Sequence, residues 1–161
     1  MRRVFWTGAA VFAAVLVETA LGHLAPGPGR LFDPFLLVVI YCALSGGETH
    51  GMLAGVAAGW VQDILFGGRV LGLSALSKLL LGYVVGLAGG RFLISGVAAR
   101  ALTLFVASVA DGLLVPWIAS IFSIETTSLG MLTLLLRAAI HALVGAALFA
   151  IVERRLERAR A

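Results

Sequence analysis

Six ionisable side chains lie inside long apolar stretches of the sequence. They are Glu18, Asp63, Lys78, Asp111, Arg137 and His141. A charge near the centre of a bilayer costs about 2.5–3.5 kcal/mol on insertion scales, so such side chains usually face the bundle interior and pair there. We therefore expect an intramembrane polar network, serving as a substrate or proton path, as structural pairing, or as contacts to another membrane subunit. We favour the last two roles, because the six residues form no catalytic set.

The sequence lacks motifs for catalysis or metal binding. His23, His50 and His141 lie on different segments without ligand spacing. Asp63 and Asp111 could form an intramembrane aspartyl pair, but neither is flanked by glycine on both sides. There is no nucleophile elbow, zinc-protease helix or phosphate-binding loop. We expect no enzyme activity, no metal site and no cofactor.

The composition is that of an integral membrane protein. The 161 residues are 61% hydrophobic and only 12% charged, with a mean hydropathy of +1.07. A soluble domain carries about 25% charged residues, because its surface must face water. The net charge of +4 is spread too thinly to form a surface that follows phosphates, so we expect no nucleic-acid partner.

Glycines, prolines and charges divide the chain into six apolar segments. They cover about residues 4–24, 31–47, 50–67, 71–90, 98–122 and 129–152, and a basic tail follows at 153–161. Asp33 and Pro34 suit the N-cap and first turn of the second segment. That segment is short, so we expect it to tilt, to thin the bilayer or to be partly re-entrant. The predicted fold is one all-α domain of six transmembrane helices.

The basic residues orient this bundle. With six crossings and the N-terminus inside, eight arginines lie on the cytoplasmic side and two outside. The inner set is Arg2, Arg3, Arg91, Arg100, Arg154, Arg155, Arg158 and Arg160, and the outer set is Arg30 and Arg69. Since cytoplasmic loops carry an excess of Lys and Arg, we expect both termini in the cytoplasm.

Two stripes of small residues predict which helices pack together. Gly51, Gly55, Gly59 and Asp63 follow one another at steps of four, and so do Ser74, Lys78, Gly82 and Gly86. Such stripes let membrane helices approach closely, either within the bundle or against a partner. The short connection between these segments makes them antiparallel neighbours, so we expect an Asp63–Lys78 ion pair. Asp111 could pair with Arg137 in the same way.

The central block resembles the MreD family of bacterial rod shape-determining membrane proteins. The similarity is clearest over residues 33–90, where a glycine-rich helix ends in an aspartate turn and a Leu-Gly pair follows. The matching residues are Gly55, Gly59, Asp63, Gly67, Leu71 and Gly72. Lys78 is less typical of the pattern, which would make its ion pair a feature of this sequence.

The resemblance implies a non-enzymatic subunit of the cell-elongation machinery in the bacterial inner (cytoplasmic) membrane. Members of that family act with MreC, the actin-like MreB, the polymerase RodA and a class B penicillin-binding transpeptidase in peptidoglycan synthesis. Because the predicted bundle has scarcely any soluble loop, we expect its partner surface to lie in the bilayer and to meet the transmembrane helix of MreC.

The rival interpretation is a transport protein. Substrate-binding S-components of energy-coupling-factor vitamin importers are six-span bundles of similar size, and the MreD fold looks distantly related to theirs. Under this interpretation a vitamin pocket would be lined by Glu18, Trp60, Asp63, Trp117 and His141, and a coupling subunit would dock on Ala9, Ala10, Ala13 and Ala14. The short outer loops, with few aromatic or polar groups to close over a ligand, argue against it.

Overall fold

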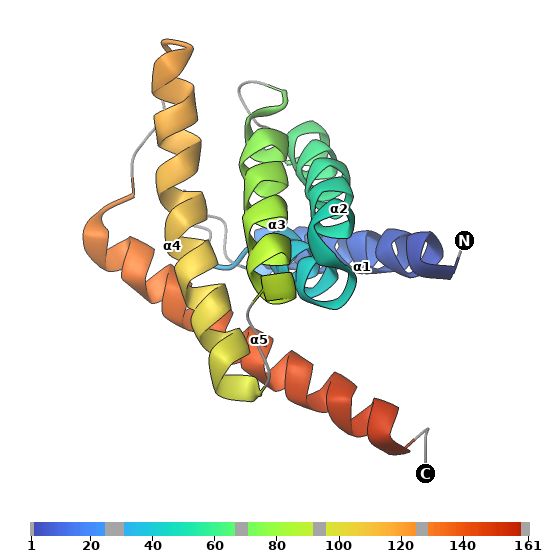
Figure 1. Ribbon diagram of the computed structural model, residues 1–161. Helices are drawn as coiled ribbons and strands as arrows, with labels where there is room; N and C mark the ends of the chain where they lie inside the picture. Colours follow the sequence, from blue (N-terminus) through green and yellow to red (C-terminus); the bar gives the residue numbers. More distant parts are fainter. Residues whose placement is uncertain (1, 25–30, 67–70, 92–95, 125–128, 159–161) are drawn as a thin grey trace.

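The computed structural model describes residues 2–24, 31–66, 71–91, 96–124 and 129–158, with side chains described for 5–23 and up to 151 in the first and last of these. This part of the chain forms five helices and no strand (Figure 1). They are α1 (Arg2–Leu24), α2 (Pro34–Leu65), α3 (Leu73–Arg91), α4 (Val97–Ile121) and α5 (Met131–Arg158). All five are long and apolar enough to cross a membrane, which confirms the class predicted from composition.

The described residues form five elements rather than the predicted six, because the segments predicted at 31–47 and 50–67 are joined in one element, α2, whose two helical halves meet at a kink with non-helical backbone. At the kink Gly47 has φ 79° and ψ −172°, a conformation that favours a residue without a side chain. One glycine suffices for the bend, so the chain needs no separate loop there. Likewise α5 remains helical to Arg158, within the segment that the sequence sets apart as a tail.

The kink at Gly47 folds α2 back on itself. Asp33 at its start accepts a hydrogen bond from Gln62 near its end, with 3.2 Å between Asp33 Oδ2 and Gln62 Nε2. Near the bend, Thr7 Oγ1 lies 3.8 Å from Cys42 Sγ and 3.1 Å from His50 Nε2. The two halves of α2 therefore run in opposite directions, and the chain reverses at the kink, where the two predicted segments meet.

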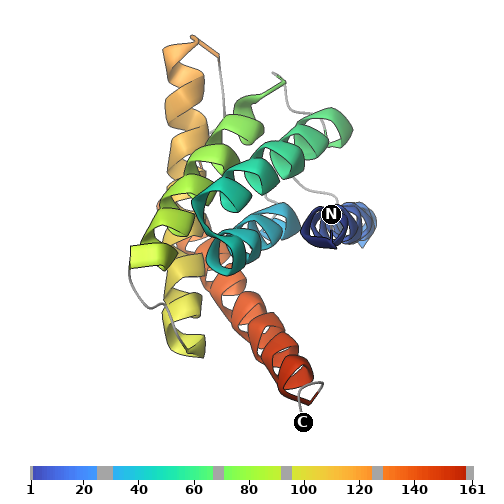
Figure 2. The same cartoon turned by 45° about the vertical axis from the view of Figure 1, so that its right-hand side comes forward.

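The second half of α2 and all of α3 pack backbone to backbone, as antiparallel neighbours (Figures 1 and 2). A Cβ built on Gly51 would lie 2.3 Å from the carbonyl oxygen of Gly82, and one on Gly55 would lie 2.3 Å from that of Lys78. A Cβ on Gly59 would meet the backbone of Ala75, and one on Gly86 that of Glu48. Both predicted stripes of small residues are therefore used for packing α2 against α3 within the chain.

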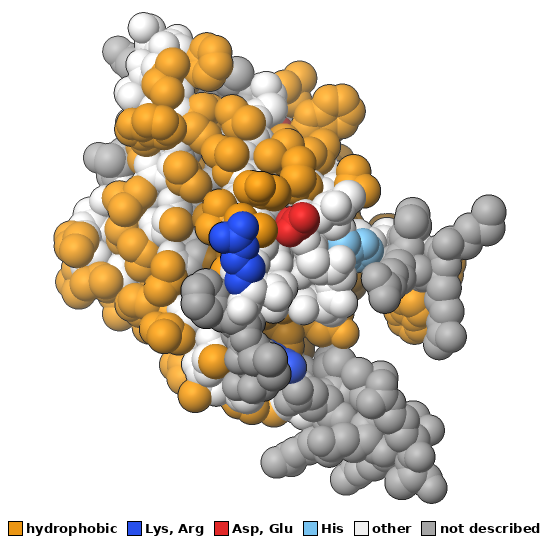
Figure 3. Space-filling view, in the orientation of Figure 1, with side chains coloured by type: hydrophobic (Ala, Val, Ile, Leu, Met, Phe, Trp, Pro, Cys, Tyr) orange, Lys and Arg blue, Asp and Glu red, His pale blue; other side chains and the backbone are white. Residues whose placement is uncertain are grey.

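The remaining helices lie on two sides of the folded-back α2, with one helix on one side and two on the other. On one side α1 buries Val11 and Ala14 beside Phe35 and Val39 of α2. On the other side α4 and α5 run antiparallel, and a Cβ on Gly145 would lie 2.0 Å from Leu104 Cδ1. The outward surface is largely hydrophobic (Figure 3), with exposed large side chains on every helix, as a lipid-facing surface requires.

Candidate functional site

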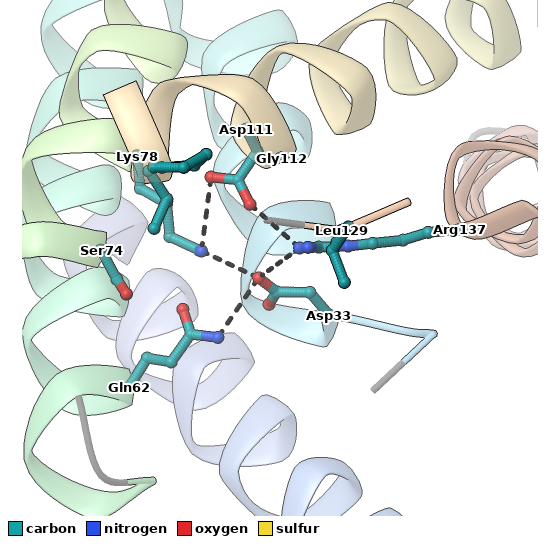
Figure 4. A pocket seen from close by; sticks show the side chains of 10 residues that line it. Asp33, Gln62, Ser74, Lys78, Asp111, Gly112, Leu129 and Arg137 are labelled. Atoms are coloured by element: carbon teal, nitrogen blue, oxygen red, sulfur yellow. Dashed lines mark hydrogen bonds and ion pairs between the residues drawn. The ribbon is translucent and has the colours of Figure 1, made fainter. Parts of the chain in front are cut away.

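Four charged side chains from four elements meet inside the bundle (Figure 4). Lys78 Nζ lies 2.8 Å from Asp33 Oδ2 and 3.8 Å from Asp111 Oδ1. Arg137 Nη2 lies 3.0 Å from Asp111 Oδ2 and 3.5 Å from Asp33 Oδ2. We call these four residues the charge cluster. With two cations and two anions it is electrically neutral, as a low-dielectric setting demands.

Neighbouring polar groups hold the two carboxylates of the charge cluster in place. Asp33 Oδ1 caps α2, accepting from the backbone N–H of Phe35 at 2.9 Å and of Leu36 at 3.2 Å. The Ser77 hydroxyl donates to Asp111 Oδ1 at 2.8 Å. Each carboxylate therefore has cationic and neutral donors, so neither is available as a free general base.

His141 locks α5 against the start of α2. Its Nε2 accepts from the backbone N–H of Asp33 at 2.8 Å, and its Nδ1 lies 2.7 Å from the carbonyl oxygen of Arg137. This set of partners requires a neutral imidazole with its proton on Nδ1. Ser108 Oγ lies 3.2 Å from the same Nδ1, and the Phe32 ring stacks on the imidazole with centroids 5.2 Å apart. The side chain thus has a structural role here.

A pocket of about 220 Å³ lies against the charge cluster. It is lined by Asp33, Gln62, Ser74, Lys78, Asp111, Gly112, Val115, Pro116, Leu129 and Arg137. These residues come from the start and end of α2, the start of α3, the second half of α4, and the start of α5. The pocket therefore lies toward the end of the bundle opposite to both chain termini.

The predicted Asp63–Lys78 ion pair is wrong. Asp63 instead caps α3, where its carboxylate accepts from the backbone N–H groups of Gly72 at 2.9 Å, Ser74 at 3.3 Å and Ala75 at 3.3 Å. The packing register explains the difference. Lys78 lies opposite Gly55, eight residues before Asp63, which is about 12 Å along a helix.

This capping role predicts a graded loss of stability. Replacing Asp63 by alanine removes the acceptor for three N–H groups, so we expect the free energy of unfolding to fall by about 2 kcal/mol. Asp63→Asn keeps one acceptor oxygen and should lose clearly less. Thermal unfolding of the detergent-solubilised protein, followed by circular dichroism, measures both variants. Equal melting temperatures for the two variants would contradict the capping role.

The other predicted residues lie apart from the charge cluster. Glu18 is buried on α1 but does not line the pocket. Leu71 is 70% exposed, and Gly72 has φ 100° at the turn before α3. Gly67 lies outside the described residues. No three His, Cys, Asp or Glu side chains in the described ranges are placed to hold a metal ion.

The residues expected to line a vitamin pocket lie outside the pocket beside the charge cluster. Trp60 is 60% exposed and Trp117 61% exposed on the outer surface, while Asp63 caps α3. None of the five expected residues lines the pocket beside the charge cluster.

Asp33 and Gln62 belong to the site, although the sequence pattern does not identify them as members. The pattern gives Asp33 only a capping role, yet the side chain contacts both cations of the charge cluster. One signal was available. The segment that Asp33 opens is short for a full span, and a re-entrant segment of that length ends at membrane depth, where a carboxylate needs cationic partners.

Comparison with known proteins gives one assignment. The family model for MreD, the rod shape-determining protein, matches residues 4–156. No curated protein and no solved structure matches the chain. The matched range covers all five helices apart from the first and last turns, and it includes the whole charge cluster. The chain therefore belongs to the MreD family of rod shape-determining proteins, and it is a multi-pass membrane protein.

Proposed function

We propose that this protein is a non-enzymatic scaffold of the cell-elongation machinery in the bacterial inner membrane, with both termini in the cytoplasm. It holds MreC through the transmembrane helix of that protein. Through MreC it supports RodA, its partner transpeptidase and the MreB filament. The match to the MreD family over residues 4–156 is the observation that carries this proposal.

The distribution of polar groups supports a structural role. The four charges of the charge cluster neutralise one another inside the bundle. The Asp63 carboxylate is engaged by backbone N–H groups at the start of α3. Both small-residue stripes are used between α2 and α3. What remains for a partner is the apolar outer surface within the bilayer.

The outer face of α1 is the most suitable part of that surface. This helix packs on the chain through Val11, Ala14 and Glu18, which are buried. Its opposite face exposes Ala9 and Ala13, one turn apart, and nothing lies within 4 Å of a Cβ built on the nearby Gly8. Small residues at such spacing allow a second helix to approach closely, so this face can accept the transmembrane helix of MreC.

A substitution on this face tests the proposed contact. Ala13→Leu places a larger side chain where the partner helix would pack, so we expect at least tenfold less MreC to co-purify from bacterial membranes. The matched control is Ala147→Leu, at an exposed alanine of α5, which should leave MreC recovery unchanged. Equal recovery with both variants, at equal folded yield, would exclude this face as the docking site.

The cellular role is tested by depletion. Cells that lose this protein should become round, because lateral wall synthesis loses its scaffold, and a plasmid copy of the wild-type gene should restore the rods. Cell shape is scored by microscopy. Rod shape that persists under full depletion would overturn the proposed function, and purification with a bound vitamin and an ATPase module would replace it with the transport function.

A further inference from the structure

The first half of α2 is too short to span the bilayer. Pro34 to Gly46 is 13 residues, or about 20 Å of helix, against a hydrocarbon core of about 30 Å. Its far end is the kink at Gly47, on the side of the chain termini. With the kink at one membrane face and the helix along the bilayer normal, its N-terminus at Asp33 would lie about 10 Å inside the opposite face.

The backbone leading to this buried N-terminus is not helical. Residues 31–33 have no regular secondary structure, although they lie at the depth of the charge cluster. Irregular backbone at membrane depth is tolerated only where it is buried in protein or lines a water-filled cavity. The pocket beside the charge cluster lies directly against Asp33 (Figure 4).

The pocket is also polar and roomy enough for water. Its volume of about 220 Å³ is more than ten times the roughly 10–15 Å³ that a single water molecule requires. Six of its ten lining residues carry a charge, an amide or a hydroxyl group: Asp33, Gln62, Ser74, Lys78, Asp111 and Arg137. A lipid tail could not hydrogen-bond to the lining atoms that lack a partner, and each unsatisfied one would cost several kcal/mol.

Two polar atoms at this pocket have no hydrogen-bond partner within the described residues. Gln62 Oε1 is an acceptor without a donor, and Arg137 Nε is a donor without an acceptor. An occupant that satisfies both atoms must donate a hydrogen bond to Gln62 and accept one from Arg137, and water does both.

From these features we propose that the pocket is an aqueous vestibule, open to the membrane face opposite the chain termini. Water reaches Gln62 and Arg137 at the bottom of this vestibule and hydrates the edge of the charge cluster. The opposite half of the bundle, where the glycine stripes bring α2 and α3 together, closes it on the side of the termini.

Cysteine labelling tests this proposal in the full-length chain. Cys42→Ala removes the only thiol, and Ser74→Cys and Val115→Cys then place one thiol in the lining, from α3 and α4. The matched controls, Leu76→Cys and Leu113→Cys, lie two residues away on outward faces that are 40% and 57% exposed. The probe is a membrane-impermeant trimethylammonium methanethiosulfonate, which reacts with hydrated thiols.

We expect both lining thiols to react at least tenfold faster than their controls, and only from the face opposite the termini. A C-terminal epitope identifies the two faces in spheroplasts and inverted vesicles, so the result does not depend on the proposed orientation. Labelling after denaturation shows that all four thiols are present. Equal rates for lining and control thiols, or reaction only from the face that carries the termini, would overturn the proposal.

Discussion

Replacing Lys78 by methionine is expected to lower the free energy of unfolding by about 3–5 kcal/mol, because it removes one partner of a buried ion pair. Lys78 is 1% exposed and contacts both Asp33 and Asp111. Without it, two carboxylates share the single positive charge of Arg137. The change should be visible as a large loss of monodisperse protein in size-exclusion chromatography after heating.

Two double variants test the electrostatic explanation. Asp111→Asn combined with Lys78→Met restores a neutral cluster, with Arg137 left to pair with Asp33, and should recover part of the lost stability. Asp63→Asn combined with Lys78→Met should recover none, because Asp63 is engaged with the backbone of α3. Recovery with the Asp63 variant and none with the Asp111 variant would show that the pairing described above is incorrect.

The second large effect is expected at Gly55. Gly55→Leu inserts a side chain whose Cβ would lie 2.3 Å from the Lys78 carbonyl oxygen and 2.8 Å from the Leu79 nitrogen. Both atoms belong to backbone, so the helices must separate, which also displaces Lys78 from Asp33. Overpacking alone costs about 1–3 kcal/mol, and we expect a total loss at least as large as for Lys78→Met. Folded yield from membranes and melting temperature measure it.

The control for Gly55→Leu is a glycine of α3 with open space around it. Nothing lies within 4 Å of a Cβ built on Gly90, and Gly90 is exposed. Gly90→Leu should therefore leave the melting temperature unchanged or raise it slightly, since glycine is a poor helix former. Comparable losses for the two leucine variants would mean that the close approach at Gly55 does not limit stability.

Composition and spacing predict much of this fold. The apolar content indicates membrane-spanning helices, and the four-residue spacing of Gly51, Gly55 and Gly59 places α2 against α3, where their close backbone contacts lie. Asp111 and Arg137 also meet, at 3.0 Å. The glycine spacing is a local signal, because helical periodicity specifies which residues share a face, whereas the Asp111–Arg137 pair follows from opposite charges on successive helices.

Periodicity does not specify which face meets which partner across a long stretch of chain. Asp33 lies 45 residues from Lys78 and 108 from His141, yet it bonds to both. That meeting depends on the reversal at Gly47, and nothing in the sequence distinguishes a sharp bend there from an ordinary loop. Asp63 is nearer to Lys78 in sequence. Because Asp63 lies at the end of α2, however, its carboxylate accepts hydrogen bonds from the backbone N–H groups at the start of α3 instead.

The long sequence separations around Asp33 constrain the order in which the chain can be assembled in the membrane. Asp33 is synthesised early, whereas Arg137 and His141 lie on the last helix. Until that helix is inserted, the carboxylates of Asp33 and Asp111 share one cation, and the backbone N–H of Asp33 lacks its acceptor. We therefore expect the charge cluster to remain incomplete until α5 is inserted, because α5 supplies both Arg137 and His141.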